Sequence, residues 1–98
     1  MVIGLRSGGL IIMRERDIEK RVCAIARSKG WWPIKIGSIH QRGVPDRMFL
    51  NQGRLVFVEF KRAGRKPTKL QACMLNRLEG LGFPVRVVDN VRDVEWLN

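Results

Sequence analysis

A chain of 98 residues with 45% hydrophobic content is long enough for one modest core and too short for two, which excludes a multidomain protein and argues against a disordered one. Its 19 Lys and Arg residues outnumber its 9 Asp and Glu residues, giving a formal net charge of +10. So much positive charge on so short a chain favours a polyanionic partner, most often nucleic acid, over a protein that is merely basic.

Residues 1–12 are apolar, but Arg6 and several glycines interrupt them, and the stretch is too short to cross a bilayer. Met13 and the charged RERDIEK that follows it have the character of a second start. We therefore expect residues 1–12 to be an extension, from an alternative start or foreign to the natural chain, and residues 13–98 to form the domain. No membrane partner is expected.

The spacing of apolar residues predicts a helix from Arg14 to about Lys29, ended by a glycine. The apolar face of this helix is formed by Ile18, Val22, Ile25 and Ala26. A strand over residues 31–36 should follow, and Pro33 indicates that it lies at a sheet edge. Residues 37–44 are polar and glycine-bearing, which predicts a loop, and His40 lies within it.

Residues 47–50 and 54–60 predict a hairpin, joined through Asn51-Gln52-Gly53. The second strand is apolar on both faces until its end, which is typical of a central strand. The sequence does not determine the register in which this strand pairs with the first. With Leu50 opposite Arg54, Asp46 lies opposite Val58, and with Leu50 opposite Leu55, Asp46 lies opposite Glu59.

The remainder predicts a basic loop over residues 62–69, a helix over 67–79, a strand over 84–88 and a closing turn or helix over 91–96. The apolar stripe of the second helix is formed by Leu70, Met74 and Leu78. The order αβββαβ predicts an α/β fold with a mixed sheet flanked by helices.

Cys23 and Cys73 both fall within helical apolar patterns, so we expect buried, reduced thiols and a cytoplasmic protein. Their spacing excludes a zinc site of the usual kind, and no small-molecule cofactor is indicated.

Asp46 heads one strand of the hairpin, and Glu59 and Lys61 lie on one face at the end of the other. Two carboxylates that approach each other need a cation between them. Mg²⁺ suits such a site because it prefers oxygen ligands and keeps several waters. Lys61 can then hold or help deprotonate a water and stabilise charge on an attacked phosphate. The plainer interpretation is a solvated Glu59–Lys61 pair and an Asp46 that caps a turn.

These residues resemble the motif of the PD-(D/E)xK nuclease superfamily, here Pro45-Asp46 followed after 12 residues by Glu59-Phe60-Lys61. More narrowly, the chain is similar to stand-alone VRR-NUC domains. Those have a G-x-P-D turn, here residues 43–46, and a basic G-[RK]-K-x-T loop, here residues 64–68. A glutamate on the first helix and a Gln on the second, here Gln71, complete the pattern, which covers about residues 13–89.

The resemblance implies a restriction-endonuclease-like fold and hydrolysis of DNA phosphodiesters with Mg²⁺, for which Mn²⁺ substitutes. It assigns the metal to Asp46, Glu59 and the Phe60 carbonyl, and the positioning of the attacking water to Lys61. For the helix acid, Glu19 is preferred over Glu15, since Glu15 lies in the first helical turn, where an acid is favoured in any case. Glu19 would reach the metal through water.

Five basic residues surround the expected site in sequence and are candidates for phosphate contact: Arg42, Arg62, Arg65, Lys66 and Lys69. Trp31 and Trp32 could stack on bases, although adjacent residues of a strand point to opposite faces, so at least one should lie in the core or an interface. The lone His40 is more often incidental than a general base.

The resemblance further implies a homodimer that acts on branched DNA, including four-way (Holliday) junctions, in a bacterial or phage-infected cell. A two-fold dimer suits a junction because its two sites can cut symmetric strands. The alternative is a non-catalytic basic module that binds nucleic acid, and a third interpretation is a small structural protein on ribosomal RNA.

Overall fold

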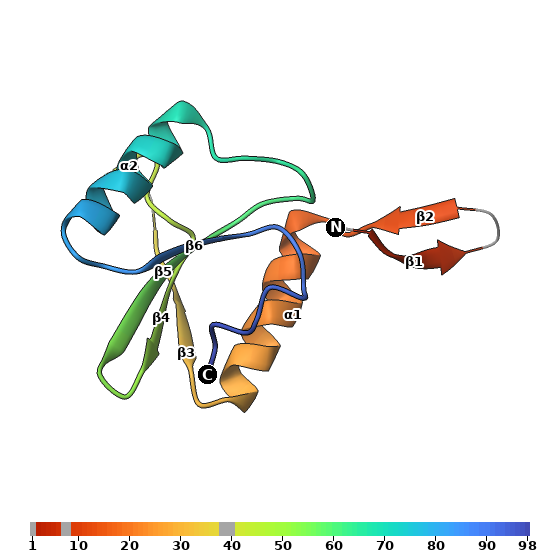
Figure 1. Ribbon diagram of the computed structural model, residues 1–98, viewed down its shortest axis with the longest axis horizontal. Coiled ribbons are helices and arrows are strands. Elements are labelled where there is room, and N and C mark those ends of the chain that lie inside the picture. Colours follow the sequence, from red (N-terminus) through yellow and green to blue (C-terminus); the bar gives the residue numbers. More distant parts are fainter. Residues whose placement is uncertain (1, 7–8, 38–40) are drawn as a thin grey trace.

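The structure is a computed structural model that describes residues 2–6, 9–37 and 41–98 (Figure 1). Its main sheet has the strand order β3-β4-β5-β6, in which β4 pairs antiparallel with both β3 and β5, and β6 pairs parallel with β5. These strands are β3 (Trp32–Lys35), β4 (Arg47–Asn51), β5 (Arg54–Phe60) and β6 (Val85–Val88). The predicted mixed sheet with a central β5 is therefore confirmed.

Two helices flank the sheet, α1 (Glu15–Ser28) on one side and α2 (Lys69–Gly80) on the other (Figure 1). The parallel pairing of β5 with β6 requires a crossover, and α2 lies within it. The αβββαβ order of the domain is thus as predicted. No helix of the described ranges is long and apolar enough to span a membrane.

A separate hairpin precedes the domain, formed by β1 (Val2–Arg6) and β2 (Gly9–Ile12). Figure 1 shows it extending away from the sheet and both helices. The sequence pattern had not predicted strands here, because glycines and Arg6 interrupt the apolar run. Met13, the first residue after the hairpin, is buried in the core of the domain.

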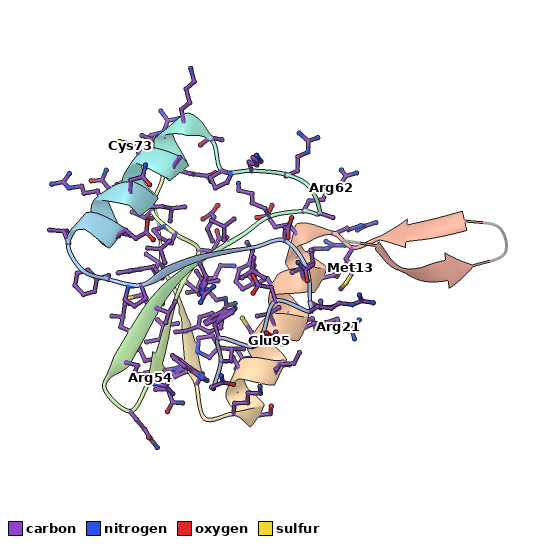
Figure 2. The ribbon with its side chains drawn as sticks, viewed as in Figure 1. Met13, Arg21, Arg54, Arg62, Cys73 and Glu95 are labelled. Carbon is purple, nitrogen blue, oxygen red and sulfur yellow. The ribbon has the colours of Figure 1, made fainter. Side chains whose placement is uncertain are left out.

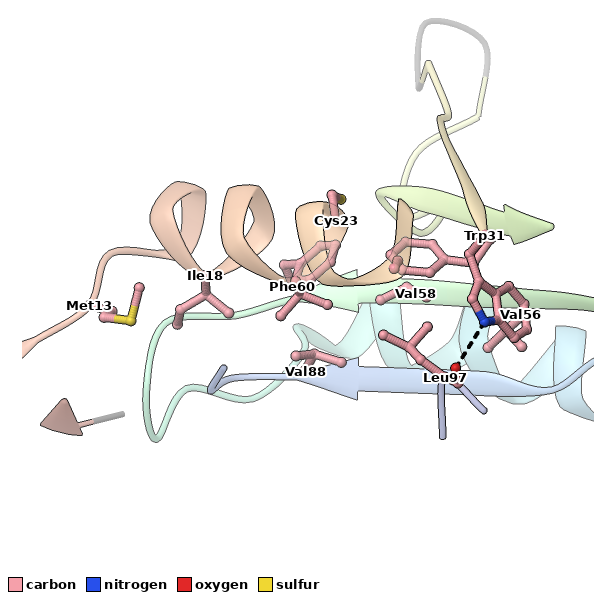
Figure 3. Packing of buried hydrophobic residues seen from close by; sticks show 12 residues of the cluster. Met13, Ile18, Cys23, Trp31, Val56, Val58, Phe60, Val88 and Leu97 are labelled. Atoms are coloured by element: carbon pink, nitrogen blue, oxygen red, sulfur yellow. Dashed lines mark hydrogen bonds between the residues drawn. The ribbon is translucent and has the colours of Figure 1, made fainter. Parts of the chain in front are cut away.

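The core lies between α1 and the sheet. Figure 3 shows it extending from Met13 at one end to Trp31 and Val56 at the other. The α1 residues buried there are Ile18, Val22, Cys23 and Ala26, with Ile25 packed against them. The facing strand residues are Phe49, Val56, Val58, Phe60 and Val88. Alternation along β5 sends Val56, Val58 and Phe60 to this face, which leaves Leu55, Phe57 and Glu59 on the other.

The β4–β5 register pairs Leu50 with Leu55, the second of the two registers that the sequence left open. The connection is shorter than predicted, because Asn51 pairs with Arg54 and only Gln52 and Gly53 remain in the turn. Both have positive φ, 47° and 78°, as a type I′ hairpin turn requires.

The helix α2 begins with a capping box in which Thr68 Oγ1 accepts from the Gln71 N–H and Gln71 Oε1 accepts from the Thr68 N–H. Two predictions about this helix were wrong. Its buried residue is Leu75, whereas Leu70 is 48% exposed, and Cys73 is exposed rather than buried. The helix covers only part of its side of the sheet. The contact with the sheet therefore buries fewer side chains of α2 than an amphipathic pattern suggests.

The edge position of β3, predicted from Pro33, is confirmed, since β3 pairs only with β4. The segment after β6 closes the core as a series of turns. Its Leu97 is fully buried, and the Leu97 carbonyl accepts from Trp31 Nε1 at 3.2 Å, the bond drawn in Figure 3.

Candidate active site

The observed register brings the two acids of the hairpin together. The β4–β5 ladder ends with Arg47 opposite Val58, so the next position outward places Asp46 opposite Glu59. Both side chains then lie on the face of the sheet away from the α1 core. The site is therefore a product of strand pairing, with one carboxylate from each strand.

Glu59 is a buried carboxylate, 1% exposed. Burial is the main cause that raises the pKa of Glu59 to about 7, and the charge of Asp46 adds to it, while Lys61 acts in the opposite direction. Glu59 Oε1 has no hydrogen-bond partner among the described residues. A buried oxygen without a partner costs free energy, so this atom is suited to receive a cation.

Lys61 is the partner of the other Glu59 oxygen, with its Nζ 3.3 Å from Oε2. Two residues apart on one strand, the two side chains share a face, as the sequence predicted. The interpretation of Glu59 and Lys61 as an ordinary solvated pair was wrong, because Lys61 is mostly buried and Glu59 is fully so. An ion pair in this setting loses hydration, so it needs further polar contacts to be stable.

Asp46 is fixed twice. Its Oδ2 accepts from the Phe60 N–H at 2.8 Å, and its backbone carbonyl accepts from the Ile36 N–H at 2.9 Å. Burial raises the pKa of Asp46, the Phe60 hydrogen bond opposes that rise, and the charge of Glu19 adds to it. Asp46 is thus held between β3 and β5.

The two helix acids differ in their partners. Glu19 Oε2 lies 2.6 Å from Arg47 Nε, in an ion pair that is half-buried. The Glu15 side chain makes no ion pair or hydrogen bond to any residue that the structure describes. Burial raises the pKa of Glu15, and so does the charge of Asp46. Both acids therefore lie within electrostatic reach of Asp46.

Gln71 is engaged at the start of α2 by the capping box, through both its side-chain oxygen and its backbone N–H. A segment before Asp46 nevertheless lies against this end of the helix. A Cβ at Gly43 would come within 2.9 Å of Leu70 Cγ. The structure thus places the first turn of α2 beside the G-V-P-D segment, and gives Gln71 a structural role there.

The oxygen donors of the site fit a hard divalent ion such as Mg²⁺. Asp46 and Glu59 supply carboxylates from neighbouring strands, and Glu59 Oε1 is buried and unpartnered in the described chain. Within residues 2–6, 9–37 and 41–98, no group of three or more His, Cys, Asp and Glu side chains has the arrangement of a metal site. The ligands expected here are two carboxylates and a backbone carbonyl, so they include fewer side chains than such a group.

Comparison with known proteins identifies the chain. No protein-family model matches it. It is 41% identical over 80 residues to "Putative nuclease p44" of Acyrthosiphon pisum secondary endosymbiont phage 1, an alignment that covers 81% of this chain and 86% of that protein. A solved structure described as "VRR_NUC domain" has a TM-score of 0.78 and 27% identity, covering 85% of this chain and 91% of that one. The chain belongs to the VRR-NUC family of nucleases.

The basic residues of this VRR-NUC domain stand at the surface. Figure 2 shows Arg62 on the loop between β5 and α2. All five predicted phosphate contacts are exposed: Arg42, Arg62, Arg65, Lys66 and Lys69. The loop is attached to the end of β6, because the Gly64 N–H donates to Asp89 Oδ2 at 3.2 Å. Its charges are therefore presented from a tethered segment that starts directly after Lys61.

The adjacent tryptophans of the VRR-NUC domain, Trp31 and Trp32, lie in different surroundings, as neighbouring residues of an extended segment should. Trp31 is buried and stands edge-on to Trp96, with 6.4 Å between ring centroids. Trp32 is 66% exposed and lines a surface pocket of about 500 Å³ near the β4–β5 turn. That turn is the end of the hairpin opposite Asp46 and Glu59. His40 lies outside the described residues.

Sequence reasoning missed Arg47, which it treated only as the first residue of a strand. Arg47 Nε contacts Glu19, and Arg47 Nη1 donates to the Pro33 carbonyl at 2.7 Å. A charged residue at the start of an apolar strand, directly after Asp46, was the available signal. Its partners lie 28 and 14 residues earlier in the chain, so the pairing itself depends on the fold.

Proposed function

We propose that this nuclease is a divalent-metal-dependent DNA endonuclease that hydrolyses phosphodiesters in branched DNA such as four-way junctions. The observation that supports it is the approach of Asp46 and Glu59, with Glu59 Oε1 buried and unpartnered in the described chain and Lys61 alongside. Asp46, Glu59 and the Phe60 carbonyl would hold the metal, and a helix acid, Glu19 or Glu15, would act through a bound water.

A bound Mg²⁺, or Mn²⁺ in its place, supplies Lewis acidity to the phosphate and lowers the pKa of water. The side chains of the protein position the water and stabilise the developing charge. Glu59 holds Lys61 Nζ on the face of β5 where the phosphate would lie. From there the ammonium orients the attacking water and stabilises negative charge as it develops on phosphate oxygens. The exposed cations Arg62, Arg65 and Lys66 would bind the DNA backbone beside it.

The test is cleavage of a labelled four-way junction, flap, nicked duplex and single strand, each with Mg²⁺, Mn²⁺ or EDTA. We expect metal-dependent cleavage with a preference for the junction. Asp46→Ala, Glu59→Ala and Lys61→Ala should each reduce the rate by at least about a hundredfold, since each removes a group that acts on the reacting phosphate. Asp17→Ala and Lys29→Ala change the same residue types at exposed positions of α1 and its end, and should cleave normally.

Cleavage that survives all three site substitutions would contradict the assignment. Binding of every DNA without cleavage, unaffected by Asp46→Ala, would support the non-catalytic module instead. Retention of RNA in preference to DNA, with no effect of metal, would support the ribosomal interpretation.

We also propose that the active form is a homodimer and that it acts in the cytoplasm of a bacterial or phage-infected cell. Part of one sheet face is left uncovered by α2, and the exposed apolar residues there and on α2 include Trp32, Leu70 and Phe83. Small domains often cover such surface by association. Sedimentation equilibrium should give twice the chain mass of 11.3 kDa, and a monomer at the concentration of the cleavage assay would contradict the dimer.

A further inference from the structure

Arg47 joins three elements of the domain at one guanidinium. It belongs to β4, its Nε lies 2.6 Å from Glu19 Oε2 of α1, and its Nη1 donates to the Pro33 carbonyl of β3 at 2.7 Å. We call these three residues the Arg47 clamp. A guanidinium is a planar fork that bonds two acceptors in fixed directions, so the clamp sets the relative positions of helix and strands more rigidly than a lysine would.

The clamp acts next to Asp46. Adjacent strand residues point to opposite faces, and Arg47 lies opposite Val58 of the core face while Asp46 lies on the face of Glu59. Asp46 itself is bonded to Ile36 and Phe60. The chain at residues 46 and 47 is therefore held by both neighbouring strands and by α1, which limits the movement of the Asp46 carboxylate.

The clamp also separates the two helix acids. Glu19 is neutralised by a cation at 2.6 Å, and moving its Oε2 to another cation would leave the half-buried Arg47 guanidinium unpaired, which is costly. Glu15, one helical turn earlier, has no such partner among the described residues. Glu15 is also a group whose charge acts on Glu59. The acid that is free to turn toward a metal is thus Glu15.

We propose that Arg47 is a positioning residue of the nuclease. Its ion pair holds Glu19 in the clamp, and its two bonds fix the start of β4, directly after Asp46. Glu15 then remains as the helix acid that faces the metal. This proposal rests on the proposed function, because it assumes that Asp46 and Glu59 hold a divalent ion. It reverses the preference for Glu19 that the sequence suggested.

The test measures Mn²⁺ binding by titration calorimetry without DNA, together with thermal unfolding of the metal-free protein. Arg47→Met and Glu19→Gln should each weaken Mn²⁺ binding about tenfold, the usual cost of losing a group that orients a ligand. Arg47→Lys should restore part of that loss. Both changes open the same clamp. The affinity for Mn²⁺ and the unfolding temperature of the double variant should therefore be no lower than those of the more strongly affected single variant.

Glu15→Gln should weaken Mn²⁺ binding without lowering the unfolding temperature of the metal-free protein, and its effect on Mn²⁺ binding should add to that of Arg47→Met. Arg21→Met is the matched control. It removes the same charge from an exposed position of α1, where Figure 2 shows the side chain directed away from the sheet. It should leave both the affinity for Mn²⁺ and the unfolding temperature unchanged.

The proposal is overturned if Glu19→Gln abolishes Mn²⁺ binding and Glu15→Gln does not, or if the effects of Arg47→Met and Glu19→Gln are additive. Should Arg47→Met fail to fold, Arg47→Lys, Glu19→Gln and Glu15→Gln still decide these outcomes. The proposed function is judged separately, on the unaltered protein. If that protein neither binds Mn²⁺ nor cleaves DNA, both fail, whereas normal cleavage with an unaffected Arg47→Met variant overturns the clamp alone.

Discussion

At the scale of single residues, Glu59 is an acid whose surroundings disfavour its charged form. It is a buried acid beside a second acid, and Lys61 compensates for only part of this. The folded protein without metal therefore favours the protonated form of Glu59 below about pH 7, whereas the proposed metal site needs the carboxylate. Folding and the proposed metal binding thus make opposite demands on the same proton.

This conflict predicts how stability depends on pH. The pKa of Glu59 is about 7 in the folded chain and 4.5 ordinarily, so between these values the folded state binds more protons than the unfolded state. Stability of the metal-free protein should therefore fall as pH rises from about 5 to about 7. The pKa values of Glu15 and Asp46 are raised too, and act in the same direction. Thermal unfolding followed by circular dichroism across this range measures the effect.

Two comparisons isolate Glu59 in that experiment. Glu59→Gln should flatten the fall in unfolding temperature, because an amide does not titrate in this range. Added Mg²⁺ at about pH 8 should raise the unfolding temperature of the unaltered protein and leave that of Glu59→Gln nearly unchanged. A stability that instead rises between about pH 5 and 7 would show that Glu59 is not destabilised by its surroundings.

Residue types and spacing were enough to select Asp46, Glu59 and Lys61, because an acid or a lysine at the end of an apolar strand conflicts with simple burial. They were not enough to assign partners. The sequence favoured Glu19 over Glu15 from their positions in the helix alone, and it gave no sign of the ion pair between Glu19 and Arg47. Contacts between residues far apart in the chain depend on packing geometry, which local patterns do not contain.

At the scale of elements, the segment before β4 depends on the start of α2. Gly43 has a positive φ of 82°, and a Cβ there would lie 2.9 Å from Leu70 Cγ and 3.1 Å from the Leu70 carbonyl oxygen. The loop thus passes the helix at a distance that only glycine permits. Through this contact, α2 supports the chain three residues before Asp46.

Gly43→Ala should therefore destabilise the domain by about 1–3 kcal/mol, from backbone strain and from the clash with Leu70. Denaturant unfolding measures this. Gly53→Ala is a matched control, since its φ is 78° but no atom lies within 4 Å of the added Cβ. The larger loss for Gly43→Ala should shrink when Leu70 is also changed to Ala. Equal losses at the two glycines would mean that Leu70 plays no part.

The four strands of the main sheet and the first helix could be predicted from the pattern of their apolar residues, and β5 was identified as central from its two apolar faces. The stripe of α2 was predicted wrongly for a physical reason. Leu70, Met74 and Leu78 have helical spacing, but the buried residue of the helix is Leu75, and a partly covered sheet allows an apolar residue such as Leu70 to stay exposed. Likewise, the two-residue hairpin turn requires a positive φ at Gln52, and glutamine is not a residue type that predicts a positive φ.

At the scale of the whole molecule, a net charge of +10 coexists with a group of acids at the proposed site. The basic loop follows Lys61 directly, and its cations are exposed, so the attraction of DNA and the repulsion of phosphate by the acids act a few residues apart. A divalent metal ion at Asp46 and Glu59 would neutralise the two carboxylates and so remove their repulsion of phosphate at that point.

Binding of junction DNA by the inactive Glu59→Gln variant should thus weaken steeply with salt. The logarithm of the binding constant should fall linearly with the logarithm of salt concentration, and removing one cation that neutralises a phosphate should reduce the slope by about 0.9. Within this background, Arg65→Gln with Lys66→Gln should reduce it by roughly 1.8. Arg77→Gln, an exposed change on α2, is the control and should not alter the slope. An unchanged slope for the loop variant would remove the loop from the DNA interface.

The hydrogen bond from the Phe60 N–H to Asp46 Oδ2 has one more consequence. It follows the last backbone pair of the β4–β5 ladder, Arg47 with Val58, and occupies the place where a further rung would form. A side-chain oxygen thus stands in for a peptide oxygen, and the carboxylate inherits the spacing between neighbouring strands, about 4.8 Å. The position of the Asp46 carboxylate relative to β5 is then set by the spacing of the strands, to which the Arg47 clamp adds the position of α1.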